Sequence, residues 1–197
     1  MSVVIIKYNA GNIQSVLFAL ERIGMQATVT DDQERIRAAS KVIFPGVGEA
    51  STAMTHLKEK GLDKLISSLT QPVLGICLGM QLLCHYSEEN NTTCLGVLEN
   101  VTIRKFTPAE KKLKVPQVGW NTICNLKGSL FTNVPENSDC YFVHSYYAED
   151  NPYSIATTDY AGSYSSAVHK NNFYGVQFHP EKSAVVGELI LKNFLAL

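Results

Sequence analysis

The stretch PVLGICLGMQLL, from Pro72 to Leu83, decides the fold of this chain. Its first part, Val73 to Ile76, is an apolar run that follows a proline, which is typical of a strand buried on both faces of a parallel sheet. The run ends at Cys77. A helical pattern follows at once, formed by Leu78, Gln81, Leu82 and His85. The sequence therefore predicts a buried strand, a sharp turn and a helix.

Cys77 lies at the centre of this turn, with Gly75 two residues before it and Gly79 two residues after it. Gly-x-nucleophile-x-Gly is the spacing of a strand-turn-helix elbow, in which small neighbours permit the sharp turn and the nucleophile projects from the top of the sheet. The positive end of the following helix favours thiolate over thiol. Cysteine is also among the most buried residue types, so a small core residue is the alternative interpretation.

A second candidate group lies near the C-terminus, where a predicted strand, Phe173 to Phe178, runs into His179-Pro180-Glu181. Pro180 restricts His179 to extended backbone angles, and residues i and i+2 of an extended chain point to the same side. We therefore expect His179 and Glu181 to lie side by side, so that the carboxylate orients an imidazole base. The alternative is a histidine at a strand end beside a solvated glutamate.

A third candidate group is the glycine-containing segment Pro45 to Gly48, which follows a predicted strand at Lys41 to Phe44. The carboxyl ends of strands are where α/β sheets bind ligands, and glycines let backbone N–H groups face a substrate. Beside a cysteine nucleophile, Val47 and Gly48 become candidates for an oxyanion hole, with the N–H of Leu78 as the second donor. An ordinary strand-to-helix turn is the alternative.

The composition limits the classes of protein to which the chain can belong. The 197 residues suggest one domain, 1–197, and a hydrophobic content of 45% with 18% charged residues is globular. A net charge of -1 gives no argument for nucleic acid or an anionic membrane as partner. The five cysteines are odd in number and form no C-x-x-C pair, which argues against a disulfide framework and a zinc site. The N-terminus lacks the pattern of a signal peptide, so we expect a cytoplasmic protein.

The two halves of the chain differ in pattern. In the first half, short apolar strands alternate with amphipathic helices, which predicts a mostly parallel central sheet with helices on both faces. In the second half, turns separate successive strands, which predicts antiparallel additions to that sheet, before a closing helix from about Val185 to Phe194. The charged segment Phe106 to Lys114 predicts a mobile surface loop. The fold class is therefore α/β.

Several stretches resemble class I (triad-type) glutamine amidotransferases: GICLGMQLL with a downstream SEE, PGVG and YGVQFHPEKS. KVPQVGWN (Lys114 to Asn121) and YFVHSYY (Tyr141 to Tyr147) resemble the glutaminase subunits of imidazole glycerol phosphate synthases rather than the wider class. The resemblance spans nearly the whole chain and implies a flavodoxin-like core. It departs at the N-terminal turn, where the family often has an acidic residue and a glycine in place of Lys7 and Asn9.

The resemblance implies a catalytic triad, with Cys77 as nucleophile, His179 as acid and base, and Glu181 as its orienter. The thiolate would attack the side-chain amide of glutamine, His179 would protonate the departing ammonia, and water would hydrolyse a γ-glutamyl thioester. This chemistry needs no metal and no organic cofactor. The glutamine pocket maps by resemblance onto Gly48, Gln81, Glu89, His144, Ser145 and Tyr146.

Within this pocket, the resemblance makes Glu89 the acceptor for the ammonium group of the substrate, with the neighbouring Glu88 as the alternative. The backbone of Ser145 and Tyr146 would hold the main-chain polar atoms of glutamine. A peptide near Val47 resembles a switch that has to turn before its N–H enters the oxyanion hole. We therefore expect the chain alone to be a poor glutaminase.

The resemblance also implies a partner, a cyclase of the (β/α)8 barrel type that forms a heterodimer with the chain. In histidine biosynthesis, that cyclase uses the ammonia to make imidazole glycerol phosphate and an aminoimidazole carboxamide nucleotide (AICAR). The candidates for the face toward it are Asn12, Trp120, Tyr141 and Lys182. Trp120 suits an interface anchor, although a core aromatic residue is an equal alternative.

Other functions remain open at this point. A glutaminase of the same fold could feed pyridoxal phosphate synthesis or a surface-sugar amidotransferase; the first is disfavoured because its elbow usually differs from GICLGMQ. A cysteine peptidase is a further possibility, although the HPE and SEE motifs favour a small amino-acid amide. A non-catalytic scaffold is disfavoured because all three triad residues are present.

Overall fold

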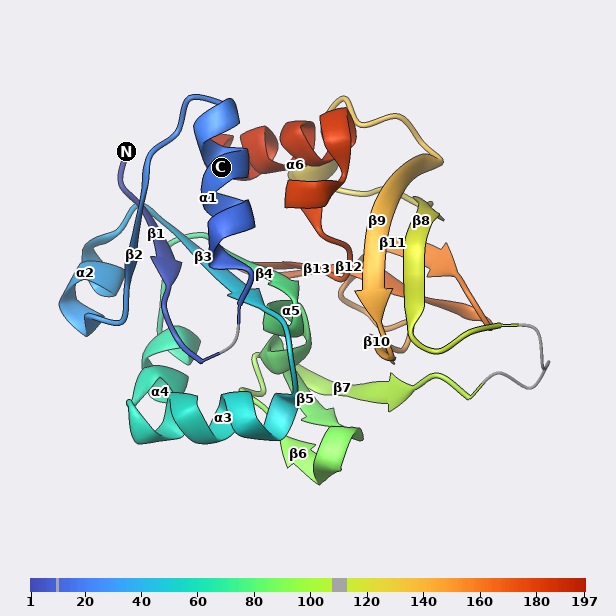
Figure 1. Cartoon of the computed structure of the whole chain (residues 1–197), viewed down its shortest axis with the longest axis horizontal. Helices are drawn as coiled ribbons and strands as arrows, with labels where there is room; N and C mark the ends of the chain where they lie inside the picture. Colours follow the sequence, from blue (N-terminus) through green and yellow to red (C-terminus); the bar gives the residue numbers. More distant parts are fainter. Residues whose placement is uncertain (10, 108–112) are drawn as a thin grey trace.

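The computed structural model describes residues 1–9, 11–107 and 113–197 of the chain (Figure 1). Its centre is a set of parallel strands in the order β2-β1-β3-β4-β13. These strands are β1 (Val3–Ile6), β2 (Ala27–Thr30), β3 (Lys41–Gly46), β4 (Val73–Cys77) and β13 (Phe173–Val176). The predicted parallel core is therefore confirmed, and the strand that leads to His179 is part of it.

The sheet continues from β13 through strands of the second half and then through two short strands within residues 84–93, mostly by antiparallel pairing. These strands are β12 (Ser163–Lys170), β10 (Tyr146–Ala148), β7 (Leu98–Lys105), β5 (Cys84–Ser87) and β6 (Thr92–Thr93), and β11 (Ser154–Asp159) pairs with β12. A separate antiparallel pair is formed by β8 (Gln117–Ile123) and β9 (Ser138–His144). The predicted antiparallel additions are therefore also confirmed.

Helices cover both faces of the sheet. In Figure 1, α1 (Ile13–Arg22) and α6 (Ala184–Ala196) lie on one side, and α3 (Ala50–Glu59) and α4 (Leu62–Ser67) lie on the other. The remaining helices are α2 (Gln33–Ala38) and α5 (Leu78–Leu83), with 3-10 turns at η1 (Glu89–Asn91), η2 (Ser129–Phe131) and η3 (Pro180–Lys182). No helix in the part of the chain that the structure describes is long and apolar enough to cross a membrane.

The core consists of two apolar clusters, one on each face of the sheet. Along β1, Val4 and Ile6 belong to the cluster under α2, α3 and α4, whereas Val3 and Ile5 belong to the cluster under α1 and α6. Successive side chains of a strand point to opposite faces, so a strand buried on both sides has to be apolar throughout. This explains why the strands that carry the site appear as continuous apolar runs.

Three details differ from the sequence-based expectation. The helix after Cys77 ends at Leu83, and His85 lies in β5. The reason is that the backbone becomes extended at Cys84 (φ -70°, ψ 177°), and the following residues pair with β7 and β6. The strand β3, expected to end at Phe44, extends through Pro45 and Gly46, so only Val47 and Gly48 of the glycine-containing segment lie outside the strand. One of the successive strands that the sequence of the second half predicts, Asp139 to Tyr147, is broken at Ser145, and its two parts join different sheets.

The predicted surface loop from Phe106 to Lys114 is wrong at its start. Phe106 is only 4% exposed and stacks on Tyr147 at a centroid distance of 4.6 Å, because it lies at the centre of an aromatic cluster. The middle of that predicted loop, 108–112, lies outside the described residues.

The register of the central strands assembles the site. Gly46 of β3 lies opposite Cys77 of β4, and Val176 of β13 lies opposite Ile76. Because the three strands are parallel, their carboxyl ends meet at one edge of the sheet. The elbow at Cys77 is therefore flanked by the Pro45–Gly48 segment on one side and by the chain leading to His179 on the other.

Candidate active site

The backbone at Cys77 adopts a conformation that non-glycine residues rarely take, with φ 53° and ψ -110°. Such strain persists only where the surroundings enforce it. A Cβ atom on Gly79 would lie 1.8 Å from the carbonyl oxygen of Phe44, and one on Gly75 would lie 2.8 Å from the backbone nitrogen of Met80. Both glycines are needed for the close approach of α5 to the strands beneath it, so the predicted elbow is confirmed.

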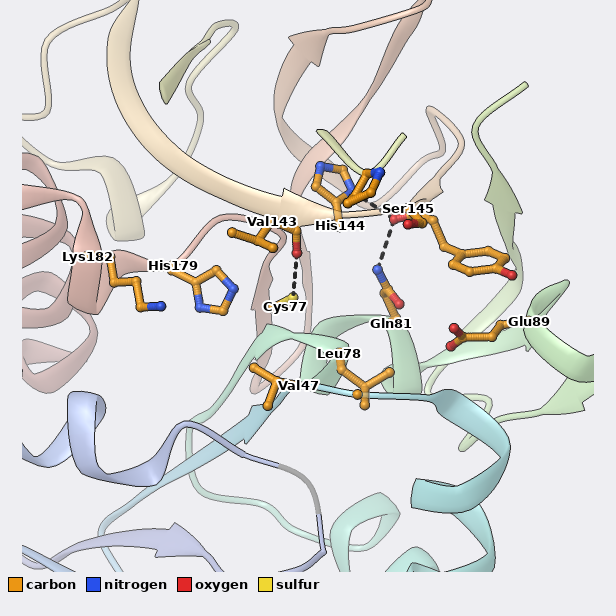
Figure 2. Close-up of a pocket in the computed structure, with 13 residues that line it drawn as sticks. Val47, Cys77, Leu78, Gln81, Glu89, Val143, His144, Ser145, His179 and Lys182 are labelled. Carbon is orange, nitrogen blue, oxygen red and sulfur yellow. Dashed lines mark hydrogen bonds between the residues drawn. The ribbon is translucent and has the colours of Figure 1, made fainter. Parts of the chain in front are cut away.

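The Cys77 thiol is held between two polar groups. Its Sγ lies 3.8 Å from the carbonyl oxygen of Val143 (Figure 2). On another side, the Sγ lies 3.7 Å from Nε2 of Gln177. Cys77 is 6% exposed, yet it lines a pocket. A sulfur atom that reaches a pocket from the N-cap position of a helix is placed as an attacking group requires.

His179 and Glu181 form the predicted contact, with 2.7 Å between Nδ1 of His179 and Oε1 of Glu181. Both side chains are buried, and only His179 reaches the pocket. Burial lowers the pKa of His179, but interactions with Cys77 and Glu181 outweigh it and raise the pKa to about 10. The imidazole beside Cys77 is therefore stabilised in its protonated form. Beyond His179 the backbone is a 3-10 turn rather than the expected extended chain.

The pocket in front of the thiol has a volume of about 320 Å³. Of the residues predicted for the site, it is lined by Val47, Gly48, Cys77, Leu78, Gln81, Glu89, His144, Ser145, Tyr146, His179 and Lys182. Pro116 and Val143 line it as well. Figure 2 shows Glu89 and Lys182 at opposite ends, with Cys77 between them, so the two ends differ in charge.

One wall of the pocket is organised around the carbonyl oxygen of Tyr146. Gln81 donates to it from Nε2 at 2.9 Å, and His144 donates from Nδ1 at 2.8 Å. The other ring nitrogen of His144 lies within 3.1 Å of Gln117 Oε1. Burial is the main reason that the pKa of His144 is lowered to about 4, so this ring is neutral. Gln81 is buried, with only 5% of its surface exposed, so its side chain does not lie on the outer face of α5.

The two adjacent glutamates have different surroundings. Glu88 accepts hydrogen bonds from Arg104 Nη1 at 2.9 Å and from the backbone N–H of Lys105 at 2.8 Å, which directs it away from the pocket. Glu89 lines the pocket, and its Oε2 accepts from the backbone N–H of Ala50 at 2.8 Å. Burial is the main reason that the pKa of Glu89 is raised. Of the two, Glu89 is the one placed to meet a ligand.

The segment predicted to form the oxyanion hole adjoins the thiol. Gly48 has φ 104°, a conformation that favours glycine, and Leu78 is the first residue of α5. Just before this segment, the buried hydroxyl of Tyr8 donates to the carbonyl oxygen of Pro45 at 2.8 Å. The base of the segment is therefore anchored, while Val47 is exposed at the pocket rim.

Three of the four residues predicted for a partner surface form one group. Trp120 is 56% exposed, which excludes the core alternative, and it contacts Tyr141 edge to face at a centroid distance of 6.0 Å. Lys182 Nζ lies 5.9 Å from the centre of the Tyr141 ring. Asn12 lies at the start of α1, where it accepts a hydrogen bond from Ser15.

Gln177 was not predicted, although a signal for it exists. It precedes His179 by two residues in the sequence, and an i, i+2 spacing in an expected strand places two side chains on the same side. In the structure the chain bends at Gln177 and Phe178, and both Gln177 and His179 interact with Cys77. Gln81 Nε2 donates to Gln177 Oε1 at 2.9 Å, which connects it to the pocket wall. For Pro116 and Val143, no sequence spacing relative to a predicted site residue indicated that they line the pocket. Within 1–9, 11–107 and 113–197, no cluster of His, Cys, Asp and Glu side chains is suited to a metal ion.

Comparisons with known proteins agree with this geometry. Residues 4–197 match the family described as Glutamine amidotransferase class-I. The imidazole glycerol phosphate synthase subunit HisH of Bacteroides fragilis (strain YCH46) is 55% identical over 197 residues, 100% of both chains. That of Haemophilus influenzae (strain ATCC 51907 / DSM 11121 / KW20 / Rd) is 45% identical over 99% of this chain and 97% of the relative.

Among solved structures, a chain of PurLQS from Thermotoga maritima is similar in fold. Its TM-score is 0.72 with 18% identity, and the match covers 99% of this chain and 97% of that chain. At this identity the likeness concerns the fold alone. The match across residues 4–197 and the full-length relatives show that the chain belongs to the class-I glutamine amidotransferase family.

Proposed function

We propose that this chain is the glutaminase component of imidazole glycerol phosphate synthase, an enzyme of histidine biosynthesis. The observation that carries the proposal is the triad geometry: a strained Cys77 at a pocket, beside a protonated His179 that Glu181 orients. The full-length relatives named as subunits of that synthase support the assignment to this pathway.

In the proposed reaction, Cys77 attacks the side-chain amide carbon of glutamine. His179 carries a proton, so it donates to the departing ammonia and then accepts a proton from the water that hydrolyses the thioester. Glu181 stabilises the imidazolium through the bond to Nδ1 and fixes its orientation. The products are glutamate and ammonia.

The pocket suits a free amino acid with a side-chain amide. Glu89 would accept the α-ammonium group, and the backbone at Ser145 and Tyr146 would hold the α-carboxylate end, with Cys77 in the same pocket to meet the amide. Gln81 and His144 would contribute by fixing the Tyr146 carbonyl. The backbone N–H groups of Leu78 and of the Val47–Gly48 segment would stabilise the oxyanion.

The partner in this proposal is a cyclase of the (β/α)8 barrel type, bound as a heterodimer in the cytoplasm. The exposed group of Trp120, Tyr141 and Lys182 supports a docking surface, because Lys182 also lines the pocket and so joins this surface to the site of ammonia release. Asn12 is a further candidate for that surface.

The experiment that tests catalysis is covalent trapping. A diazoketone analogue of glutamine is expected to label Cys77 far faster than the other thiols, and excess glutamine should protect it. Mass spectrometry of the labelled chain gives the site and rate. Labelling at the rate of an ordinary thiol would contradict the proposal and favour a scaffold.

The rival within the same chemistry is a glutaminase for a surface-sugar amidotransferase. Binding assays with the cyclase of each synthase from the same organism distinguish the two, since only the true partner should bind and stimulate glutamate release.

A further inference from the structure

Two carboxylates share the first turn of α3, directly after the segment proposed for the oxyanion hole. Glu49 accepts from the backbone N–H of Ser51 at 2.7 Å and from that of Thr52 at 2.8 Å. Glu89 accepts from the N–H of Ala50 at 2.8 Å. Thus the three free N–H groups that open the helix are all bonded to carboxylate oxygens. Of these two carboxylates, only that of Glu89 lines the pocket.

Asn90 links the two carboxylates. Its Nδ2 donates to Oε1 of Glu49 at 2.9 Å, while its backbone is in the left-handed region with φ 50°. Asparagine tolerates this conformation better than most residues. The carbonyl oxygen of Glu89 accepts from the hydroxyl of Thr92, which closes the turn on its other side. The residue after Glu89 is therefore held against α3 by the Glu49 side chain.

The Glu49 carboxylate also adds charge to this end of the pocket. Burial by itself raises the pKa of Glu49, but hydrogen bonds from Thr52 and Ser51 outweigh it and lower the pKa to about 2. Glu49 is therefore ionised at any pH at which an enzyme of this class works. It is close enough to contribute, after burial, to the raised pKa of Glu89. The end of the pocket opposite Lys182 is thus lined by the Glu89 carboxylate (Figure 2). The Glu49 carboxylate lies outside the lining but acts electrostatically on Glu89.

We propose that Glu49 is a positioning residue that determines specificity for a substrate with an ammonium group. It would act without touching the substrate, by holding the Glu89 loop through Asn90 and by adding a second negative charge behind Glu89. This inference rests on the proposed function, because it assigns the α-ammonium group of glutamine to Glu89. A helix cap without influence on the substrate is the competing interpretation.

The test separates charge from capping. Serine and aspartate are both good N-cap residues, so Glu49→Ser keeps a cap and removes the charge, whereas Glu49→Asp keeps both. Glu59→Gln is the matched control, because it removes an exposed charge from the other end of the same helix. Each variant is assayed in the complex with the cyclase, with glutamine and with glutaramate, which is glutamine without its α-amino group.

The expected result is a change in discrimination. Glu49→Ser should raise KM for glutamine about five-fold with kcat nearly unchanged, and should leave kcat/KM for glutaramate unchanged. Where glutaramate reacts too slowly, its inhibition constant gives the same comparison. Glu49→Asp should restore most of the discrimination, Asn90→Ala should shift it in the same direction as Glu49→Ser, and Glu59→Gln should leave it unchanged.

Equal losses for glutamine and glutaramate in Glu49→Ser would overturn the inference and leave Glu49 as a cap only. Unchanged kinetics for both compounds would overturn it as well. The proposed function is tested separately by the wild-type complex in the same assay. If the wild-type complex fails to release glutamate from glutamine, that result contradicts the proposed function and therefore also this inference.

Discussion

At the scale of the residue, the burial of His144 predicts how the stability of the folded chain depends on pH. In the folded chain its pKa is about 4, against an ordinary value near 6.5, because the ring is buried. Between these pH values the unfolded chain binds more protons than the folded chain, so stability falls as the pH drops from about 6.5 to 4. We expect His144→Gln to lose less stability over this range than the wild type, by on the order of 1–3 kcal/mol.

Denaturant unfolding at pH 7 and at pH 4 measures this difference. The variant is its own reference, since the comparison uses the change with pH rather than the absolute free energy of unfolding. Parallel pH dependence in the two proteins would show that His144 is not the titrating group.

A second residue-scale prediction concerns Tyr8, whose buried hydroxyl donates to the carbonyl oxygen of Pro45, at the base of the segment proposed for the oxyanion hole. Tyr8→Phe keeps the ring packed on Phe44, at a centroid distance of 5.3 Å, and removes one hydrogen bond. We expect the free energy of unfolding to fall by about 1 kcal/mol. Tyr86→Phe removes an exposed hydroxyl that donates to Asn91 and should cost much less. Equal effects in the two variants would contradict the role given to the Tyr8 hydroxyl.

The residues of the candidate site differ in how far the sequence predicts them. Cys77 and the pair His179 and Glu181 are predictable because an elbow and a strand end are determined by a few consecutive residues. Val143 is not, because its carbonyl reaches Cys77 only through the pairing of distant segments. The environment of Glu89 likewise depends on Ala50, which is 39 residues away.

At the scale of the element, the elbow explains why α5 requires glycine at its second position. A glycine-to-alanine change inside a helix ordinarily stabilises by about 1 kcal/mol. In Gly79→Ala, however, the new Cβ would lie 1.8 Å from the Phe44 carbonyl oxygen. We therefore expect the opposite sign, a loss of about 1–3 kcal/mol, together with slower trapping of Cys77.

The matched control for Gly79→Ala is Gly24→Ala, at a glycine outside α5. A Cβ on Gly24 has no neighbour within 4 Å, and only the positive φ of 79° is unfavourable. That variant should lose about 1 kcal/mol of stability and leave the trapping rate of Cys77 unchanged. Thermal unfolding and labelling kinetics measure the two effects. A stabilised Gly79→Ala would contradict the close packing of α5 on β3.

Element boundaries show where local patterns lose their predictive value. The helical pattern from Leu78 to His85 continues past the real end of α5, because pairing of Cys84–Ser87 with β7 overrides it. Phe106 begins a charged segment, yet it is buried because aromatic rings from β10 and β12 surround it. Both errors come from contacts between distant parts of the chain.

At the scale of the whole molecule, a substitution of Trp120 tests the proposed docking surface. Trp120→Ala should weaken binding of the cyclase by about ten-fold, since exposed tryptophans at interfaces tend to dominate affinity. It should leave the trapping rate of free Cys77 unchanged. Phe18→Ala removes another exposed aromatic side chain, on α1, and should leave affinity unchanged. Titration calorimetry with the cyclase measures both, and equal affinities for wild type and Trp120→Ala would contradict this surface.

The most direct test of the central claim is glutamate release from glutamine by the purified chain, alone and with the cyclase and its nucleotide ligand. We predict low release by the chain alone, strong stimulation in the liganded complex, and complete loss in Cys77→Ala. High activity of the chain alone without stimulation would contradict the partner assignment. No glutamate release by the liganded complex would contradict the glutaminase function itself.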